Sequence, residues 1–175
     1  GVRRQIFDET YSKSVNNFIK EASYGQSYLT GDIFGWYTLP FNAGELCILN
    51  TLRPAAIAAS DRDIDFRNYK RVIIVFPRVG CSWGATASIG GRITNTSDGQ
   101  LFLTTHAIQF PTFGNAISDS SVHELGHNFG LAHANDWECG NDIFRTNCQS
   151  ISYGDLFDIM GTSGALMGHY NAVHK

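Results

Sequence analysis

The chain has 175 residues, of which 43% are hydrophobic and 17% charged, a composition typical of one globular domain with a sizeable core. Its formal net charge is −3 and its Lys and Arg residues form no basic stripe, so the charge does not favour nucleic acid as a partner. The longest apolar runs, such as residues 72–76, are far too short to cross a bilayer, and we expect no membrane partner.

The first part of the chain predicts a helix followed by a strand. Residues 10–22 carry apolar side chains at helical spacing, and Gly25 closes that helix. Residues 28–39 are rich in β-branched and aromatic side chains, which predicts a strand bent at Gly31 and Gly35. The apolar positions of the helix are Val15, Phe18, Ile19 and Ala22.

The middle of the chain continues this alternation. We expect a second helix over about residues 53–64, because a proline such as Pro54 is well placed in a first helical turn. Residues 71–77 form a short apolar run suited to a buried strand. The glycine-rich residues 81–99 predict a loop and edge-strand region, and residues 100–110 predict another strand.

The last part predicts one long helix and little regular structure after it. Residues 118–129 form this helix, with Ser118 or Asp119 as its cap. After Gly130 we expect mostly irregular chain and a final helix over residues 168–175.

These elements predict a single α/β (α+β) domain over residues 1–175, because no repeat, low-complexity tract or linker divides the chain. The upper subdomain, about residues 1–130, would hold a mixed twisted sheet and the helices. A small irregular lower subdomain, about residues 131–175, would lie below a cleft between the two.

The four cysteines predict two disulfides in a secreted domain, with three connectivities open. Cys139 and Cys148 bracket a short polar loop and are the favoured pair, which leaves Cys47 with Cys81. The alternative is four free thiols in a cytosolic protein. Zinc binding by these cysteines is disfavoured because no Cys-x-x-Cys pair exists. We expect a secreted, extracellular protein whose signal peptide has been removed.

The most informative stretch is HELGHNFGLAH, residues 123–133. On a helix, His123 and His127 leave the same face about one turn apart, and Glu124 beside them can reach a metal-bound water without being a ligand. Gly130 can end the helix with a positive φ and turn the chain so that His133 approaches from another direction. Three protein nitrogens with one open position are typical of a catalytic zinc site.

A second motif follows 27 residues after His133 (160 − 133), where Met160 precedes the turn-forming Gly161. This is the pattern of the Met-turn, the hydrophobic floor beneath the zinc in metzincins. With both motifs the chain resembles the metzincin metallopeptidases and is most similar to the gametolysin family. The matching segments are residues 21–25, 31–37, 123–135, 153–155, 158–161 and 170–175.

The resemblance implies a zinc endopeptidase with a metzincin-like catalytic domain. Zn²⁺ would be held by His123, His127 and His133, with Met160 as the Met-turn residue. The implied substrates are proteins or peptides of the extracellular matrix or cell wall, and a pro-segment or accessory domain is expected outside this chain. One departure is the start of the domain, since metzincins usually open with a strand and only about nine residues precede the first predicted helix.

The motif also predicts a mechanism. Zn²⁺ held by three neutral imidazoles lowers the pKa of its bound water toward about 7. Glu124 would take a proton from this water as it attacks the peptide carbonyl, and would then pass the proton to the leaving amine. Many metzincins add a tyrosine near the Met-turn, where this chain has Thr162; Tyr153 and Tyr170 are the candidates for that role.

The remaining polar candidates receive simpler interpretations. Asp136, Asp155 and above all Asp158 are candidates to orient the ligands through hydrogen bonds. His106 is expected to be structural or to line the cleft, and His169 and His174 to be surface or packing residues. The acids of residues 61–65 lack the glycine and closing glutamate of a calcium loop, so a solvated helix end is the better interpretation.

Two other functions stay open beside the endopeptidase. One is a catalytically inactive binding or adhesion module with a metalloprotease fold, which the intact Glu124 argues against. The other is a zinc hydrolase acting on something other than peptides. In each case we expect a monomer.

Overall fold

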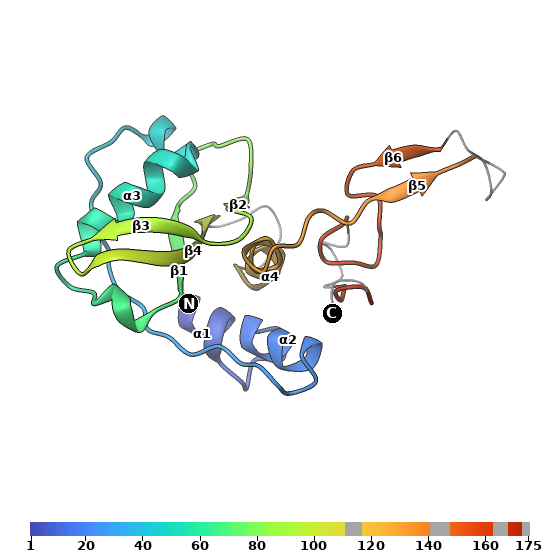
Figure 1. Ribbon diagram of the computed structural model, residues 1–175, viewed down its shortest axis with the longest axis horizontal. Helices are drawn as coiled ribbons and strands as arrows, with labels where there is room; N and C mark the ends of the chain where they lie inside the picture. Colours follow the sequence, from blue (N-terminus) through green and yellow to red (C-terminus); the bar gives the residue numbers. More distant parts are fainter. Residues whose placement is uncertain (111–116, 141–147, 163–167, 173–175) are drawn as a thin grey trace.

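The computed structural model of the protein describes residues 1–110, 117–140, 148–162 and 168–172. These residues form a mixed α/β fold, in which a four-stranded sheet and its helices lie on one side and a two-stranded hairpin projects on the other (Figure 1). The coarse prediction of an α+β fold with a mixed sheet is confirmed.

The four-stranded sheet is built around one long strand. Strand β4 (Gly99–Phe110) pairs in parallel with β1 (Arg71–Pro77), and in antiparallel with β2 (Ala85–Ala87) and β3 (Arg92–Thr96). The predictions of strands over residues 71–77 and 100–110, and of edge-strand structure within residues 81–99, are therefore confirmed. Because β4 is central, its second half is almost fully buried.

Helix α4 (Ile117–Asn128) lies between the sheet and the two N-terminal helices. It packs on β2 and β4 on one side and on α1 (Val2–Phe7) and α2 (Val15–Ala22) on the other, as Figure 1 shows with α4 seen end-on. The main core lies around this helix, so both of its long sides are held by packing. Its buried members include Ile6, Val15, Phe18, Ile19, Ile108, Val122, Leu125, Ile159 and Met160.

The N-terminal helices differ from the prediction in two respects. The helix predicted from residue 10 begins at Val15, because the Ser14 hydroxyl caps it by accepting the Asn17 N–H (3.2 Å). Helix α1 was not predicted, since six residues are too few to show helical periodicity. No strand precedes α2 within residues 1–110, where the sequence left open a very short opening strand or none, and helix α1 occupies this part of the chain.

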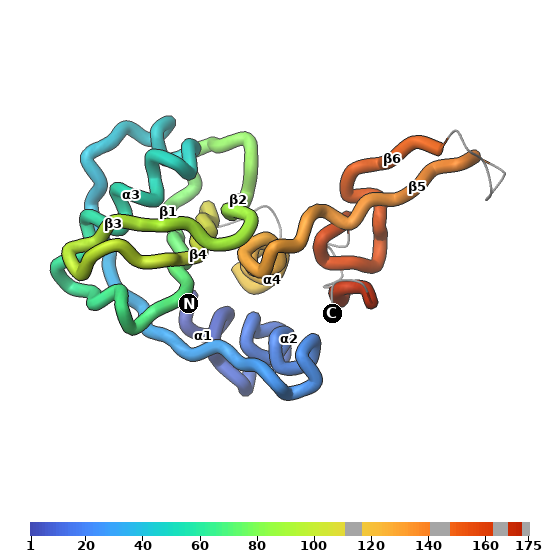
Figure 2. Tube along the Cα trace, viewed as in Figure 1, coloured from blue at the N-terminus to red at the C-terminus, as the bar shows by residue number. Residues whose placement is uncertain are grey.

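The strand predicted over residues 28–39 is wrong. The segment is extended but pairs with no other strand, and it crosses the molecule as a loop from α2 toward α3 (Figure 2). Its contacts are made with side chains instead: the Leu29 N–H donates to Asn16 (2.7 Å), and Asp32 accepts from the Tyr69 hydroxyl (2.8 Å). The β-branched and aromatic residues of this segment led to the prediction of a strand, but a strand forms only where another strand pairs with it.

The second predicted helix is displaced toward the N-terminus. Helix α3 covers Leu49–Ser60 rather than residues 53–64, so Pro54 lies in its interior. Its early start is fixed by packing, because Leu52 is fully buried in a second core cluster beside the Cys47–Cys81 disulfide. Short 3-10 turns flank α3 on both sides, η1 (Ala43–Cys47) before it and η2 (Phe66–Asn68) after it.

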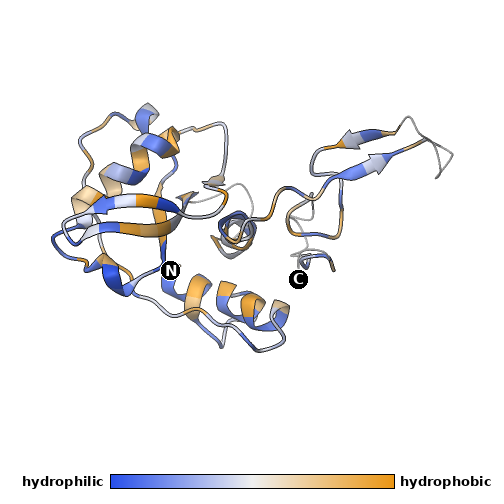
Figure 3. Ribbon diagram, viewed as in Figure 1, coloured by the Kyte–Doolittle hydropathy of each residue, from blue (hydrophilic) through white to orange (hydrophobic). Residues whose placement is uncertain are grey.

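The C-terminal part contains a hairpin that the sequence did not predict. Strands β5 (Asp136–Glu138) and β6 (Gln149–Ile151) pair antiparallel, and the Cys139–Cys148 disulfide closes the hairpin beyond them. All six strand residues are exposed, and Figure 3 shows the hairpin as mostly hydrophilic. Both predicted disulfides are thus present, and they indicate an oxidising, extracellular environment.

Two terminal predictions need correction. Residues 168–172 do not form the predicted C-terminal helix. His169 pairs with Asp158 in an isolated parallel bridge, and a turn follows. The rest of the predicted helix, residues 173–175, lies outside the described residues. Helix α4 begins at Ile117, so Ser118 and Asp119 lie in its first turn and neither is the cap. None of the described helices is long and apolar enough to cross a membrane.

Candidate metal centre

The end of α4 is shaped so that three histidines can meet. The helix carries His123 and His127 and ends at Asn128. Gly130 then adopts φ +101°, a left-handed conformation that favours glycine, and its N–H donates to the His127 carbonyl (2.9 Å). The reversal returns the chain toward the helix, which is the role that the sequence predicted for Gly130.

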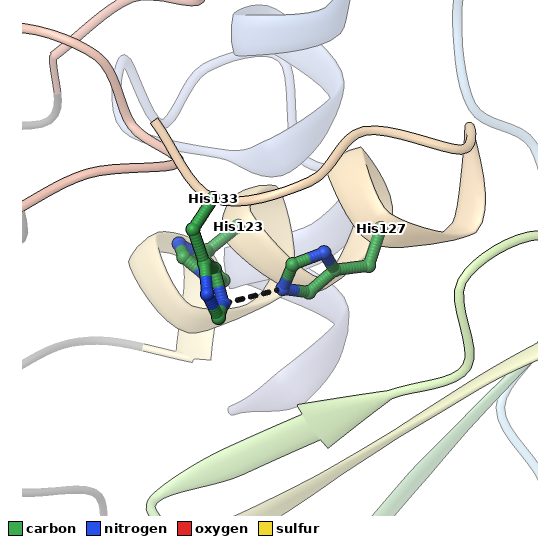
Figure 4. A group of neighbouring side chains, drawn as sticks. All are labelled: His123, His127 and His133. Atoms are coloured by element: carbon green, nitrogen blue, oxygen red, sulfur yellow. Dashed lines mark hydrogen bonds between the residues drawn. The ribbon is translucent and has the colours of Figure 1, made fainter. Parts of the chain in front are cut away.

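The three imidazoles converge at one point. Each of His123, His127 and His133 offers a ring nitrogen, and these nitrogens lie within 4.8 Å of one another. Figure 4 shows His133 descending from the loop onto the two helical histidines, with its Nε2 atom 3.1 Å from that of His127. Tetrahedral ligands at about 2.0 Å from zinc are separated by about 3.3 Å, so this spacing suits a shared metal ion.

Backbone carbonyls fix the tautomer of the two helical histidines. The Nδ1 atom of His123 lies 2.7 Å from the Ile159 carbonyl, and that of His127 lies 2.8 Å from the Leu131 carbonyl. A carbonyl can only accept, so each Nδ1 carries the proton and each Nε2 keeps its lone pair for the cluster. Burial also lowers the pKa of His123 and of His133, which favours the neutral rings that bind metals.

Two of the predicted aspartates, Asp155 and Asp158, hold the turn beside the histidines. Asp158 is fully buried, and its carboxylate accepts the backbone N–H groups of Met160 (2.7 Å) and Asn171 (2.9 Å). It therefore holds the turn that presents the Ile159 carbonyl. Asp155 accepts from the Asp158 N–H (3.1 Å), whereas Asp136 is exposed on the hairpin.

Met160 packs against α4 at Gly126, which lies between His123 and His127 in the sequence. It is fully buried, and its sulfur occupies the space beside Gly126: a Cβ atom placed on that glycine would be 2.3 Å from Sδ. The Ala134 N–H, next to His133, donates to the Met160 carbonyl (2.9 Å). The predicted Met-turn residue thus packs between the helix and the returning chain.

Glu124 is a buried carboxylate beside the cluster. The residue is 6% exposed, and its Oε2 atom has no hydrogen-bond partner among the described residues. Burial raises its pKa to about 8. A buried, unpartnered carboxylate is costly unless a cation or polar ligand approaches it, so it fits a site that receives a metal and water.

Of the two candidate tyrosines, only Tyr153 lies at the cluster. Its ring centroid is 3.7 Å from that of His133, and burial followed by the charge of Glu124 raises the pKa of its hydroxyl. It adopts φ +60°, an uncommon conformation for a residue with a side chain. Tyr170 is buried elsewhere and donates to the Val122 carbonyl (2.9 Å), and Thr162 bonds to the Tyr153 carbonyl.

A pocket of about 240 Å³ opens beside the cluster. It is lined by Ala85, Asp119, Ser120, His123, Glu124, Tyr153, Ile159 and Gly161. The sequence interpretation treated Asp119 only as a helix-cap candidate and gave Ser120 no role. Their position four residues before His123 and Glu124 on the same helix could have identified them as lining residues.

The other histidines and acids lie away from the cluster. His106 is fully buried on β4 and pairs with Asn128, as expected of a structural residue. His169 is partly exposed, stacks on Phe18 and pairs with Glu21 (3.0 Å). His174 lies outside the described residues. Within residues 61–65 the carboxylates of Asp61 and Asp65 accept backbone N–H groups, consistent with a helix end.

Comparisons of the chain with models of protein families, with curated proteins and with solved structures return no match. Function is therefore inferred from the motifs and from the geometry of the centre. A cluster of three imidazoles next to a buried carboxylate and a pocket can bind a divalent metal and place a proton acceptor beside it.

Proposed function

We propose that this protein is a secreted zinc-dependent endopeptidase of the metzincin type, most similar to the gametolysin family. One observation carries the proposal: three imidazoles meet at one point, and one of them, His123, lines a pocket together with the buried Glu124, whose Oε2 atom has no hydrogen-bond partner among the described residues. Structural zinc sites use four protein ligands, whereas three protein ligands leave a position open for chemistry.

Each residue of the centre would have a distinct role. His123, His127 and His133 would hold Zn²⁺, which in such sites polarises a carbonyl and makes water acidic enough to attack near neutral pH. Glu124 accepts a proton from the attacking water and delivers it to the leaving amine. Tyr153 would donate from its hydroxyl to the developing oxyanion, a role supported by the contact of its ring with that of His133.

The substrate class and setting belong to the same proposal. Two disulfides support an extracellular protein, and the resemblance to gametolysins supports matrix or cell-wall proteins as substrates. Residues 1–130 and 131–175 would form the upper and lower parts of one monomeric catalytic domain.

The competing functions differ in their chemistry. An inactive binding module would bind metal and protein without cleavage, and it has no need of an unpartnered buried carboxylate. A zinc hydrolase of another substrate class would keep Glu124 but leave peptides intact. The structural feature that favours peptide hydrolysis over the binding module is therefore Glu124.

A cleavage assay separates the three functions. We expect the zinc-loaded protein to hydrolyse casein or quenched fluorescent peptides, a chelator to abolish this, and added Zn²⁺ to restore it. Glu124→Gln is expected to retain stoichiometric zinc by elemental analysis and to lose cleavage by about 1,000-fold or more, because it removes the proton acceptor without altering volume.

Matched histidine variants control for this result. His133→Ala is expected to lose zinc, whereas His169→Ala, outside the cluster, is expected to keep both zinc and activity. Cleavage by Glu124→Gln at the wild-type rate would refute the mechanism. Zinc binding without cleavage by the unaltered protein would favour the binding module or the other hydrolase.

A further inference from the structure

The pocket beside the metal cluster extends the reactive face of α4 by one helical turn. Asp119 precedes His123 by four residues, and Ser120 precedes Glu124 by four. The two members of each pair therefore lie on the same face of the helix, about 6 Å apart along its axis. All four residues line the pocket of about 240 Å³. A ligand bound at the cluster would therefore reach Asp119 with a side chain.

The charge of the pocket is uneven along this direction. Its described lining residues include two carboxylates, Asp119 and Glu124, and no Lys or Arg. A divalent ion on the three imidazoles would make the histidine end positive, and Glu124 would offset part of that charge. Asp119 places the second carboxylate one helical turn away from that end.

Part of the pocket wall is made of small and apolar residues. Ala85 and Gly161 line the pocket together with the aliphatic Ile159. An extended apolar stem can therefore pass along this wall, while a positive group at its tip meets the carboxylate. Lysine has this construction, a four-carbon stem with a compact ammonium, and arginine offers a forked guanidinium that can pair with a carboxylate in two bonds.

We propose that this pocket selects a Lys or Arg side chain next to the scissile bond, with Asp119 as the specificity-determining residue. The proposal rests on the endopeptidase function proposed above. It names the substrate class as basic segments of proteins, and it assigns no role in the chemical step to Asp119.

Paired peptides test the proposal directly. A peptide library cleaved by the zinc-loaded protein is expected to show enrichment of Lys or Arg at one position flanking the cleaved bond. A peptide with Lys there is expected to have a kcat/KM about tenfold or more above that of its norleucine counterpart, which has the same stem without the ammonium. Asp119→Asn is expected to remove that ratio, mainly by lowering kcat/KM for the Lys peptide.

Two further measurements keep the test decisive. Should Asp119→Asn fold poorly, Ser120→Asp, which adds a carboxylate to the same wall, is expected to raise the Lys-to-norleucine ratio. In the Glu124→Gln background, calorimetric titration is expected to show tighter binding of the Lys peptide, and this readout needs no turnover. Asp63→Asn, a neutralised acid remote from the pocket, is expected to change nothing.

The outcomes distinguish the two proposals. Cleavage with equal rates for Lys and norleucine, or a ratio unchanged in Asp119→Asn, overturns the specificity assignment and leaves the endopeptidase function intact. Absence of any peptide cleavage, with equal binding of the two peptides in the Glu124→Gln background, overturns both.

Discussion

Mild acid is expected to destabilise the fold through His106, the fully buried histidine of β4. Its partner Asn128 donates to the carbonyls of Ser88 (3.0 Å) and Thr105 (3.1 Å), so the Asn128 side-chain oxygen must be the atom that faces His106. His106 therefore donates from Nδ1 across 3.3 Å as a neutral ring. Burial, which disfavours the charged ring, lowers its pKa from 6.5 to about 4.

The sign and size of the effect follow from this pKa. Between its unfolded value of 6.5 and its folded value of about 4, the unfolded chain binds the proton and the folded chain does not. The stabilisation is thus fully present above pH 6.5 and is lost as the pH falls toward 4. A difference of about 2.5 units at about 1.4 kcal/mol each gives a loss of about 3 kcal/mol.

The assay is denaturant unfolding of the metal-free protein at a series of pH values, compared with His106→Asn. Asparagine places an amide N–H near the position of Nδ1 and does not titrate, so the bond to Asn128 can persist. Above about pH 7 the two proteins differ only by packing. Toward about pH 4 the wild type is expected to lose about 3 kcal/mol more than the variant. Equal losses in both proteins would refute this account of His106.

Two further predictions concern packing and cross-links. Gly126→Ala is expected to lower the free energy of unfolding by about 1–3 kcal/mol, because the added Cβ would collide with the buried Met160 sulfur. Thermal unfolding measures this loss, with Gly44→Ala as the control because nothing lies within 4 Å of a Cβ there. A loss in Gly126→Ala no larger than that in Gly44→Ala would contradict the prediction. Replacing both cysteines of the Cys47–Cys81 pair by alanine is expected to reduce the free energy of unfolding by about 4 kcal/mol, against about 3 kcal/mol for the Cys139–Cys148 pair. The first disulfide closes the longer loop, with a sequence separation of 34 rather than 9, and therefore restricts the unfolded chain more. Equal losses in chemical denaturation would argue against this explanation.

The centre could be predicted from sequence because its geometry is mostly local. His123 and His127 need only a helix, and Gly130 needs only its freedom of φ to return His133. The disulfide pairing was also predictable, since the short separation of Cys139 and Cys148 left one remaining pair. In each case a short-range rule decided the structure.

The sequence could not predict features that depend on distant partners. Residues 28–39 have strand composition but no strand beside them, and α3 begins at Leu49 because Leu52 is drawn into the core. The carbonyl of Ile159 that orients His123 lies 36 residues away along the chain. A backbone carbonyl has no sequence signature, so the aspartates were expected in its place.

The bond between His123 and Ile159 also bears on when the site becomes functional during synthesis. A ribosome makes α4 and all three histidines well before it makes Ile159 and Met160. Until that turn has left the ribosome and docked, the His123 ring lacks its orienting carbonyl, and Gly126 faces no methionine. A metal centre built in this way would be completed only after the segment around Ile159 had been translated and had folded onto α4.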